Sequence, residues 1–316
     1  MEGNVIHVLD TTSMSPPQSV QDMIMEYVEC GETPYAIYCE IRENVDRLWP
    51  KSRDLARQII DHVEETSYAV TSPLGLGDMP STARDVLLLA LLDKIGLITV
   101  HDDDNKVLWE IKSREGLQGG TRKLTFSERV GRCPLHSDSA FAYNPEKYLC
   151  LYVVKESGDG GGESVVVSIA DAIAELRDEQ DGETCLRVLR DTIFPFRTPP
   201  AFSKRTKTLT APILSGSSTV RYRYDCIEDG FTDIPELDTD DRRWAVSYFS
   251  DFVENRASKH TFLAMRDQLL VVDNRRSLHA RTDFRDAERA LIRARLHAPP
   301  ASVSAGRGAP IHATST

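Results

Sequence analysis

The sequence has 316 residues, of which 41% are hydrophobic and 28% charged, a composition typical of a globular protein with a substantial core. Its net charge of −11 disfavours nucleic acid as a partner, because binding to phosphate backbones depends on Lys and Arg. The sequence contains no run of about 18 apolar residues, so we expect no membrane span, and the opening MEGNVIHVLD lacks the pattern of a secretory signal.

The region from about residue 18 to residue 100 has the pattern of a helical segment. Apolar side chains recur there at helical spacing and place an apolar stripe on one face. Thr82 is a candidate N-cap for the third helix, and Gly96 is a candidate end for it. We expect these helices at 18–30, 51–66 and 82–96.

From about residue 105, short segments rich in Val, Leu and Tyr alternate with turns of Gly, Asp or Ser, which is typical of β-strands. We expect strands within 107–113, 148–155, 163–168, 219–225, 260–264, 268–273 and 290–296. Two helices interrupt them, one at 169–190 with Ser168 as its cap and one at 239–256. The pattern predicts a mainly β fold with flanking α-helices, either a sandwich or a jelly roll.

We expect one domain over residues 1–300, with an N-terminal helical part at about 18–100 and a β core at about 105–298. Residues 301–316 are rich in Ala, Ser, Gly and Thr without periodicity, which predicts a disordered tail. The six cysteines form no CxxC pair, so we expect reduced thiols and a cytoplasmic protein.

Two side chains at 136 and 138 are candidate metal ligands. In an extended segment, residues two apart point the same way, so His136 and Asp138 would aim at one point. A His-x-Asp triplet alone is common, and the alternative is a polar loop. His279, which follows a buried strand and a turn, can supply a third ligand. Two histidines and one carboxylate form the facial triad of non-haem Fe(II) oxygenases, although zinc sites with three protein ligands also exist.

Three arginines downstream favour iron and a keto acid. Arg289, Arg293 and Arg295 alternate with apolar residues, so on a strand they share one face. Arginine can hold a carboxylate through two parallel hydrogen bonds, which the distal carboxylate of 2-oxoglutarate requires. The alternative is an edge strand with a basic face toward solvent.

Together these motifs make the sequence resemble the taurine dioxygenase and clavaminate synthase-like superfamily of Fe(II)/2-oxoglutarate oxygenases. The matching segments are HSDSAF at 136–141, GGES at 161–164, DNRRSLHAR at 273–281 and RALIR at 289–293. The pattern DNRR-x-x-H followed by R-x-x-x-R is specific, whereas residues 1–125 contain no matching motif. Because the carboxylate ligand Asp138 is present, halogenation is disfavoured.

The resemblance implies a double-stranded β-helix, a cupin-like jelly roll, in which His136, Asp138 and His279 hold Fe(II). It also implies that Arg289 binds the distal carboxylate of 2-oxoglutarate with help from the Ser164 hydroxyl. Arg293 would lie beside this co-substrate or contact an anionic group of the substrate. Which of the two arginines holds 2-oxoglutarate stays open at this point.

We therefore expect a dioxygenase that couples the conversion of 2-oxoglutarate and O2 into succinate and CO2 to the oxidation of a C–H bond in a small molecule. Hydroxylation of a polar metabolite, such as an amino acid or a natural-product intermediate, is the leading hypothesis. Desaturation or ring formation would need the same ligands. The rival classes are a jelly-roll hydrolase or isomerase that uses zinc or manganese, and a binding protein without catalysis.

Overall fold

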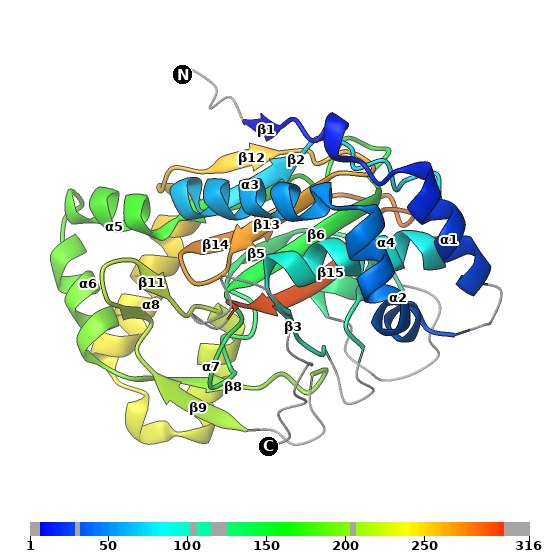
Figure 1. The fold of residues 1–316 in the computed structure, drawn as a ribbon. Coiled ribbons are helices and arrows are strands. Elements are labelled where there is room, and N and C mark those ends of the chain that lie inside the picture. Colours follow the sequence, from blue (N-terminus) through cyan, green and yellow to red (C-terminus); the bar gives the residue numbers. More distant parts are fainter. Residues whose placement is uncertain (1–6, 29–31, 102–105, 115–124, 203–206, 300–316) are drawn as a thin grey trace.

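The computed structural model describes residues 7–28, 32–101, 106–114, 125–202 and 207–299. The predicted tail, 301–316, lies outside these residues. Two sheets face each other, and helices cover both outer faces (Figure 1). Among the described helices, none has the length and apolarity needed to cross a membrane.

The larger sheet combines strands from both ends of the chain. In spatial order the strands are β1 (Val8–Leu9), β2 (Tyr68–Thr71), β13 (Leu269–Asp273), β6 (Tyr148–Lys155), β15 (Ala290–His297) and β3 (Leu97–Ile98), and β4 (Trp109–Lys112) also pairs with β15. The antiparallel centre is built from β13, β6 and β15, and β1 joins β2 in parallel at one edge.

The smaller sheet is antiparallel and carries two of the candidate ligands. Its order is β12 (His260–Phe262), β7 (Ser164–Ser168), β14 (Ser277–Arg281) and β5 (Cys133–His136). Val70, Leu149 and Val272 of the larger sheet form one buried cluster with Val166 and Phe262 of the smaller sheet, so this cluster lies between the sheets. Two short hairpins stand apart, β8 (Phe194–Arg197) with β9 (Thr208–Ala211) and β10 (Leu214–Ser215) with β11 (Thr219–Val220).

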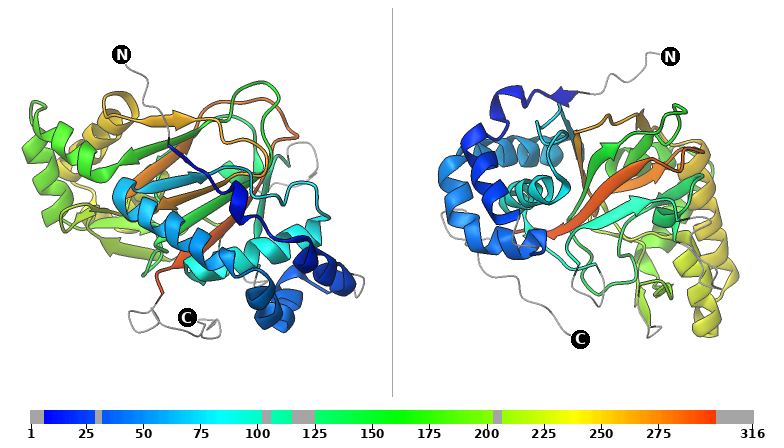
Figure 2. Two further views of the ribbon diagram at one scale, coloured as in Figure 1. Left: turned by 45° about the horizontal axis from the view of Figure 1, so that its top comes forward. Right: turned by 90° about the vertical axis from the view of Figure 1, so that its right-hand side faces the viewer.

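The outer face of the larger sheet is covered by the four N-terminal helices, which lie on one side of the strands in the right-hand view of Figure 2. They are α1 (Gln18–Val28), α2 (Pro34–Leu48), α3 (Lys51–Thr66) and α4 (Ser81–Ile95). Along β13, Val271 packs under these helices while Leu270 and Val272 face the other sheet. Side chains alternate between faces along a strand, so a strand buried on both faces is apolar throughout.

The second layer of helices packs on the smaller sheet, where Val165, Val167 and Leu278 belong to its buried cluster. These helices are α5 (Ile169–Arg177), α6 (Gly182–Asp191), α7 (Tyr224–Asp233) and α8 (Asp240–Asn255). The yellow α8 lies on the opposite side of the strands from α1–α4 (Figure 2). Ser168 caps α5 by accepting a hydrogen bond from the Asp171 amide, as predicted.

Four predictions about these elements were wrong. The chain forms α2, which the sequence reading passed over, although Thr33 caps it and Pro34 occupies its first turn. The predicted helix 169–190 is two helices, α5 and α6. The predicted strand 219–225 ends at Val220, and α7 begins at Tyr224.

The fourth error concerns the third predicted helix, which begins at Ser81 without a side-chain cap, so Thr82 does not cap it. Gly96 does lie at its C-terminal end, as predicted. Because the α-helices contain more residues than the strands, the fold is a mixed α/β fold with a sheet-rich core, not mainly β.

Candidate active site

His136 and His279 face each other because of the register between two strands. β14 pairs antiparallel with β5, and His279 is the direct partner of His136. Side chains directly opposite in such a pair project from the same face, with Cβ atoms about 5 Å apart. The two imidazole rings accordingly lie 4.3 Å apart between centroids. The convergence of these histidines thus follows from strand pairing.

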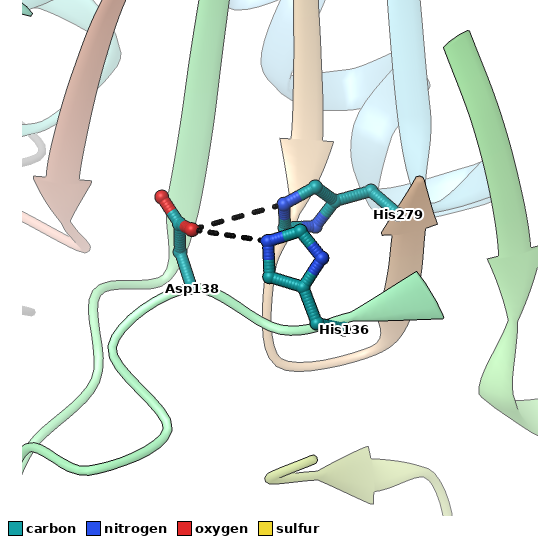
Figure 3. Close-up of side chains that lie close together, drawn as sticks. All are labelled: His136, Asp138 and His279. Carbon is teal, nitrogen blue, oxygen red and sulfur yellow. Dashed lines mark ion pairs between the residues drawn. The ribbon is translucent and has the colours of Figure 1, made fainter. Parts of the chain in front are cut away.

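Asp138 brings a carboxylate to the same point from the turn after β5. Its Oδ1 lies 3.6 Å from His136 Nε2 and 3.9 Å from His279 Nε2, and Figure 3 shows both rings turning these nitrogens toward it. One donor atom from each residue lies within 4.8 Å of the other two. Donors sharing one ion at about 2.1 Å stand roughly 3 Å apart, so small side-chain movements would let them bind a single metal.

Asp138 is not placed by strand alternation, since β5 ends at His136. Instead, the buried Asn274 side chain holds its backbone. Asn274 Oδ1 accepts from the Asp138 amide at 2.7 Å, and Asn274 Nδ2 donates to the carbonyls of Asp138 and Glu146, each at 3.0 Å. The next residue, Ser139, has a φ of 56°, which few non-glycine residues adopt. This clamp therefore fixes the turn that aims the carboxylate.

We expect Asn274→Asp to lower metal affinity by about 10- to 100-fold, the usual effect of disturbing a group that orients a ligand. Aspartate keeps the acceptor but loses both donors and places a charge against two carbonyls. Titration with Fe(II) and thermal unfolding would measure the effect. The exposed Asn255→Asp is the control, and equal metal affinity in both variants would contradict the positioning role.

The protonation states of Asp138 and His279 suit metal binding, whereas His136 must lose a proton. Burial works to raise the pKa of Asp138, but Arg293, His136 and His279 lower it well below its ordinary value, so the group is a carboxylate. Burial, helped by His136, lowers the pKa of His279 to about 3 and keeps the imidazole neutral. Burial works to lower the pKa of His136, but Cys133 and Asp138 raise it to about 10. Its Nδ1 donates to the carbonyl of Pro134 at 2.9 Å, so the proton that a metal would displace is the one on Nε2, which faces Asp138.

The three arginines share one face, as their alternation predicted, with Arg289 directly before β15 and the other two within it. Arg289, Arg293 and Arg295 are each less than a tenth exposed, while Ile292 and Ala294 pack under the N-terminal helices. The alternative of an edge strand is wrong, because β15 lies between β6 and the pair β3 and β4. The arginine face therefore points into the space between the sheets.

Each of these arginines has a different partner. Arg293 Nη1 lies 3.4 Å from Asp138 Oδ2, so it contacts the triad directly. Arg295 Nε donates to His101 Nδ1 at 3.1 Å, and His101 Nε2 then donates to the carbonyl of Arg293. His101 is thus a buried histidine with both ring nitrogens hydrogen-bonded. Arg289 Nη2 donates to the carbonyl of Gly162 at 3.1 Å and has no acidic partner in the described part of the chain.

A pocket of about 660 Å³, counted to its open mouth, joins the triad to Arg289 and Ser164. No hydrogen bond between described atoms joins Ser164 to Arg289. The pocket is also lined by Phe126, Phe202 and Arg223, which the sequence reading did not single out. Phe126 begins a short 3-10 helix, Phe202 lies in a turn and Arg223 directly precedes α7. They carry no recognisable motif, so only the fold brings them to the site.

Comparison with known proteins gives a family and a set of similar folds. Residues 88–295 match the family model described as "Taurine catabolism dioxygenase TauD, TfdA family". No curated protein sequence matches the chain. Asparagine oxygenase in complex with Fe(II), 2S,3S-3-hydroxyasparagine and succinate is 16% identical with a TM-score of 0.67, covering 92% of this chain and 94% of that chain.

A second solved structure, the non-heme iron oxygenase OrfP with Fe and alpha-ketoglutaric acid, is 15% identical with a TM-score of 0.59, covering 93% of this chain and 94% of that chain. At these identities the two structures show a shared fold. The family model matches more than half of the sequence, which decides against a zinc hydrolase, an isomerase or a non-catalytic binding protein. The chain belongs to the TauD, TfdA family and is a non-haem iron dioxygenase that uses 2-oxoglutarate and O2.

Proposed function

We propose that the enzyme hydroxylates an unactivated C–H bond of a small amino acid or a related metabolite, with His136, Asp138 and His279 as the iron ligands. The observation that carries this proposal is the convergence of two imidazoles and one carboxylate beside an arginine-lined pocket. Such a ligand set leaves coordination positions open for a keto acid and O2. When bound, the iron supplies the oxidation of 2-oxoglutarate to succinate and CO2 and the transfer of one oxygen atom to the C–H bond.

Arg289 and Ser164 would hold the distal carboxylate of 2-oxoglutarate. A buried charge without a counterion is costly, so a guanidinium in this setting favours an anionic ligand. Burial, with the nearby Arg281, lowers the pKa of Arg289 to about 10, and the group therefore stays charged at neutral pH. Gly162 leaves room for it, because a Cβ there would lie 2.8 Å from Arg289 Nε.

Arg293 has a different place in this proposal. It already faces the Asp138 carboxylate, so it would orient that ligand and lie beside the co-substrate near the metal. This contact supports Arg289 as the residue for the distal carboxylate, which stands at the far end of a keto acid from the atoms that chelate iron.

The two facing sheets support a double-stranded β-helix as the framework of the site. The two histidines lie on the smaller sheet, Asp138 follows its strand β5, and the arginines lie on or directly before β15 of the larger sheet, so the pocket forms between the sheets. The neighbours named above support an amino-acid substrate, since one was solved with hydroxyasparagine. OrfP was likewise solved with (3S)-hydroxy-L-Arg.

The test is succinate release from the Fe(II)-loaded enzyme in air, with 2-oxoglutarate and a panel of free amino acids. We expect one or more amino acids to stimulate succinate release and to gain the mass of one oxygen atom. A product that has lost two hydrogens would mean that the enzyme catalyses desaturation instead of hydroxylation. Succinate release that no amino acid stimulates would refute the substrate class.

A further inference from the structure

Arg223 lies against the triad although no part of the proposed iron or 2-oxoglutarate site uses it. The segment before α7 runs alongside Ser137, the residue between two of the proposed ligands. The Ser137 amide donates to the carbonyl of Tyr222 at 2.7 Å, and the Tyr222 amide donates to Ser137 Oγ at 3.0 Å. Arg223 follows directly and lines the active-site pocket, with its guanidinium carbon 5.7 Å from the ring centroids of Phe126 and Phe202. Backbone pairing therefore fixes this side chain beside the metal site.

The other arginines of the pocket are already engaged. Arg281 donates to the backbone carbonyls of Phe126, Arg129 and Gly131, and Arg293 faces Asp138. Arg289 is the proposed partner of 2-oxoglutarate. Arg223 lines the pocket beside the triad, and its hydrogen bonds with described residues use only Nε and Nη2, which leaves Nη1 for a ligand.

Those two hydrogen bonds join Arg223 to Asp225 at 2.9 and 3.0 Å and form a paired cation and anion. The Asp225 side chain is 47% exposed, and it lines a second pocket that meets the first at Phe126, His136 and Arg223. The pair is neutral as a whole, so it complements a ligand that also carries both charges. A free α-amino acid has a carboxylate for the guanidinium edge and an ammonium for the aspartate.

One wall of the pocket beyond this pair is apolar. Ile111, Leu149, Leu151 and Leu291 form it, and Asp138 is the only acid among the described residues that line the pocket. The described lining contains no Asn or Gln side chain, and its uncharged hydrogen-bonding side chains are the hydroxyl groups of Thr125, Ser127 and Ser164. Against the apolar wall, a substrate side chain with an amide or a cationic group would lose hydrogen bonds with water, which disfavours such a side chain.

We propose that Arg223 and Asp225 form the head-group subsite for the substrate and select an α-amino acid with an apolar side chain. The carboxylate binds the free edge of Arg223 and the ammonium binds Asp225, while the side chain extends along the apolar wall toward the triad. This inference rests on the proposed function, because it places a substrate next to the same iron site.

The first experiment compares ligands that differ in one charged group. The anaerobic wild-type enzyme is loaded with Fe(II) and 2-oxoglutarate, and the visible absorption of the keto-acid chelate is followed during titration. The ligands are L-leucine, 4-methylpentanoate without the ammonium, and 3-methylbutylamine without the carboxylate, with further apolar L-amino acids and with L-asparagine and L-arginine as polar comparators. We expect apolar amino acids to perturb the band and each analogue of a binding amino acid to bind at least about 10-fold more weakly, because each loses a charged hydrogen bond.

The outcomes separate two kinds of failure. If the band does not form with Fe(II) and 2-oxoglutarate alone, the proposed function fails. If the band forms but L-asparagine or L-arginine perturbs it more strongly than every apolar amino acid, or the analogues bind as well as the parent, only the head-group proposal is overturned.

The second experiment uses substitutions in the pair. We expect Arg223→Gln and Asp225→Asn to raise KM for the amino acid by about 10- to 100-fold, with a smaller rise for Arg223→Lys. Arg243→Gln is the matched control, because Arg243 forms a similar paired contact with Asp238 on the exposed surface. Thermal unfolding of every variant checks the fold. Equal KM values in Arg223→Gln and Arg243→Gln would overturn the proposal.

Discussion

Replacing Asp138 with alanine is expected to lower the affinity for Fe(II) by more than about 100-fold, since even the partners that orient a ligand contribute 10- to 100-fold. The substitution removes the carboxylate donor. It also leaves Arg293, which is 7% exposed, without the acid that lies 3.4 Å from it. The Arg293 cation beside the two imidazoles would then repel a metal cation. Removing the carboxylate therefore takes away an attraction for Fe(II) and leaves the repulsion between Arg293 and Fe(II) uncompensated.

The same change should also affect stability. Breaking a buried ion pair by removing one partner costs about 3–5 kcal/mol, so the metal-free variant should unfold at a lower temperature than the metal-free parent. Asp251→Ala removes an exposed ion pair with Arg256 and is the control, with an expected cost of about 0–1 kcal/mol. Unchanged Fe(II) affinity in Asp138→Ala would contradict the assignment of this carboxylate as a ligand.

The placement of the arginines could be predicted because their spacing carries physical meaning. Arg293 and Arg295 alternate at the period of a strand, and β15 does place them on one face, with Arg289 buried directly before it. The partnership of His136 with His279 could not be derived in this way. It depends on the register between two strands that are far apart in sequence, and register is set by pairing rather than by either strand alone.

Asp138 does converge with His136, but not through the strand alternation from which this was predicted. Its side chain meets His136 not because both lie on one strand but because Asn274 clamps a turn with an unusual φ at Ser139. The motif DNRR contains this asparagine, yet its contact with the Asp138 backbone spans 136 positions of sequence. Long-range side-chain contacts of this kind leave no periodic signal.

The pocket wall was the least predictable part of the site. Arg223 was placed in a predicted strand because Val220 and Tyr222 alternate with polar residues. In the structure Tyr222 is buried against Phe249, with ring centroids 5.2 Å apart, and α7 begins two residues later. Packing against α8 overrides the local β pattern, and this override brings Arg223 to the triad.

Arg289→Gln is expected to raise KM for 2-oxoglutarate more than about 100-fold, because removing one partner of a buried charge pair costs about 2–5 kcal/mol. Arg293→Gln should instead mainly weaken Fe(II) binding, because this arginine contacts the Asp138 carboxylate. Succinate release at varied 2-oxoglutarate, with saturating Fe(II), distinguishes the two effects. A larger rise in KM for 2-oxoglutarate in Arg293→Gln than in Arg289→Gln would mean that Arg293, not Arg289, binds the distal carboxylate.

A second pair of variants tests the position of Arg289 without removing its charge. Gly162 has a φ of 74°, and a Cβ there would meet Arg289 Nε at 2.8 Å, so Gly162→Ala should push the guanidinium aside. Gly160 has a similar φ of 76°, but a Cβ there would meet nothing within 4 Å. Both substitutions carry the same backbone strain, of the order of 1 kcal/mol. Gly162→Ala should therefore weaken 2-oxoglutarate binding and Gly160→Ala should not. Equal KM values for 2-oxoglutarate in the two variants would contradict the proposed contact between Arg289 and the co-substrate.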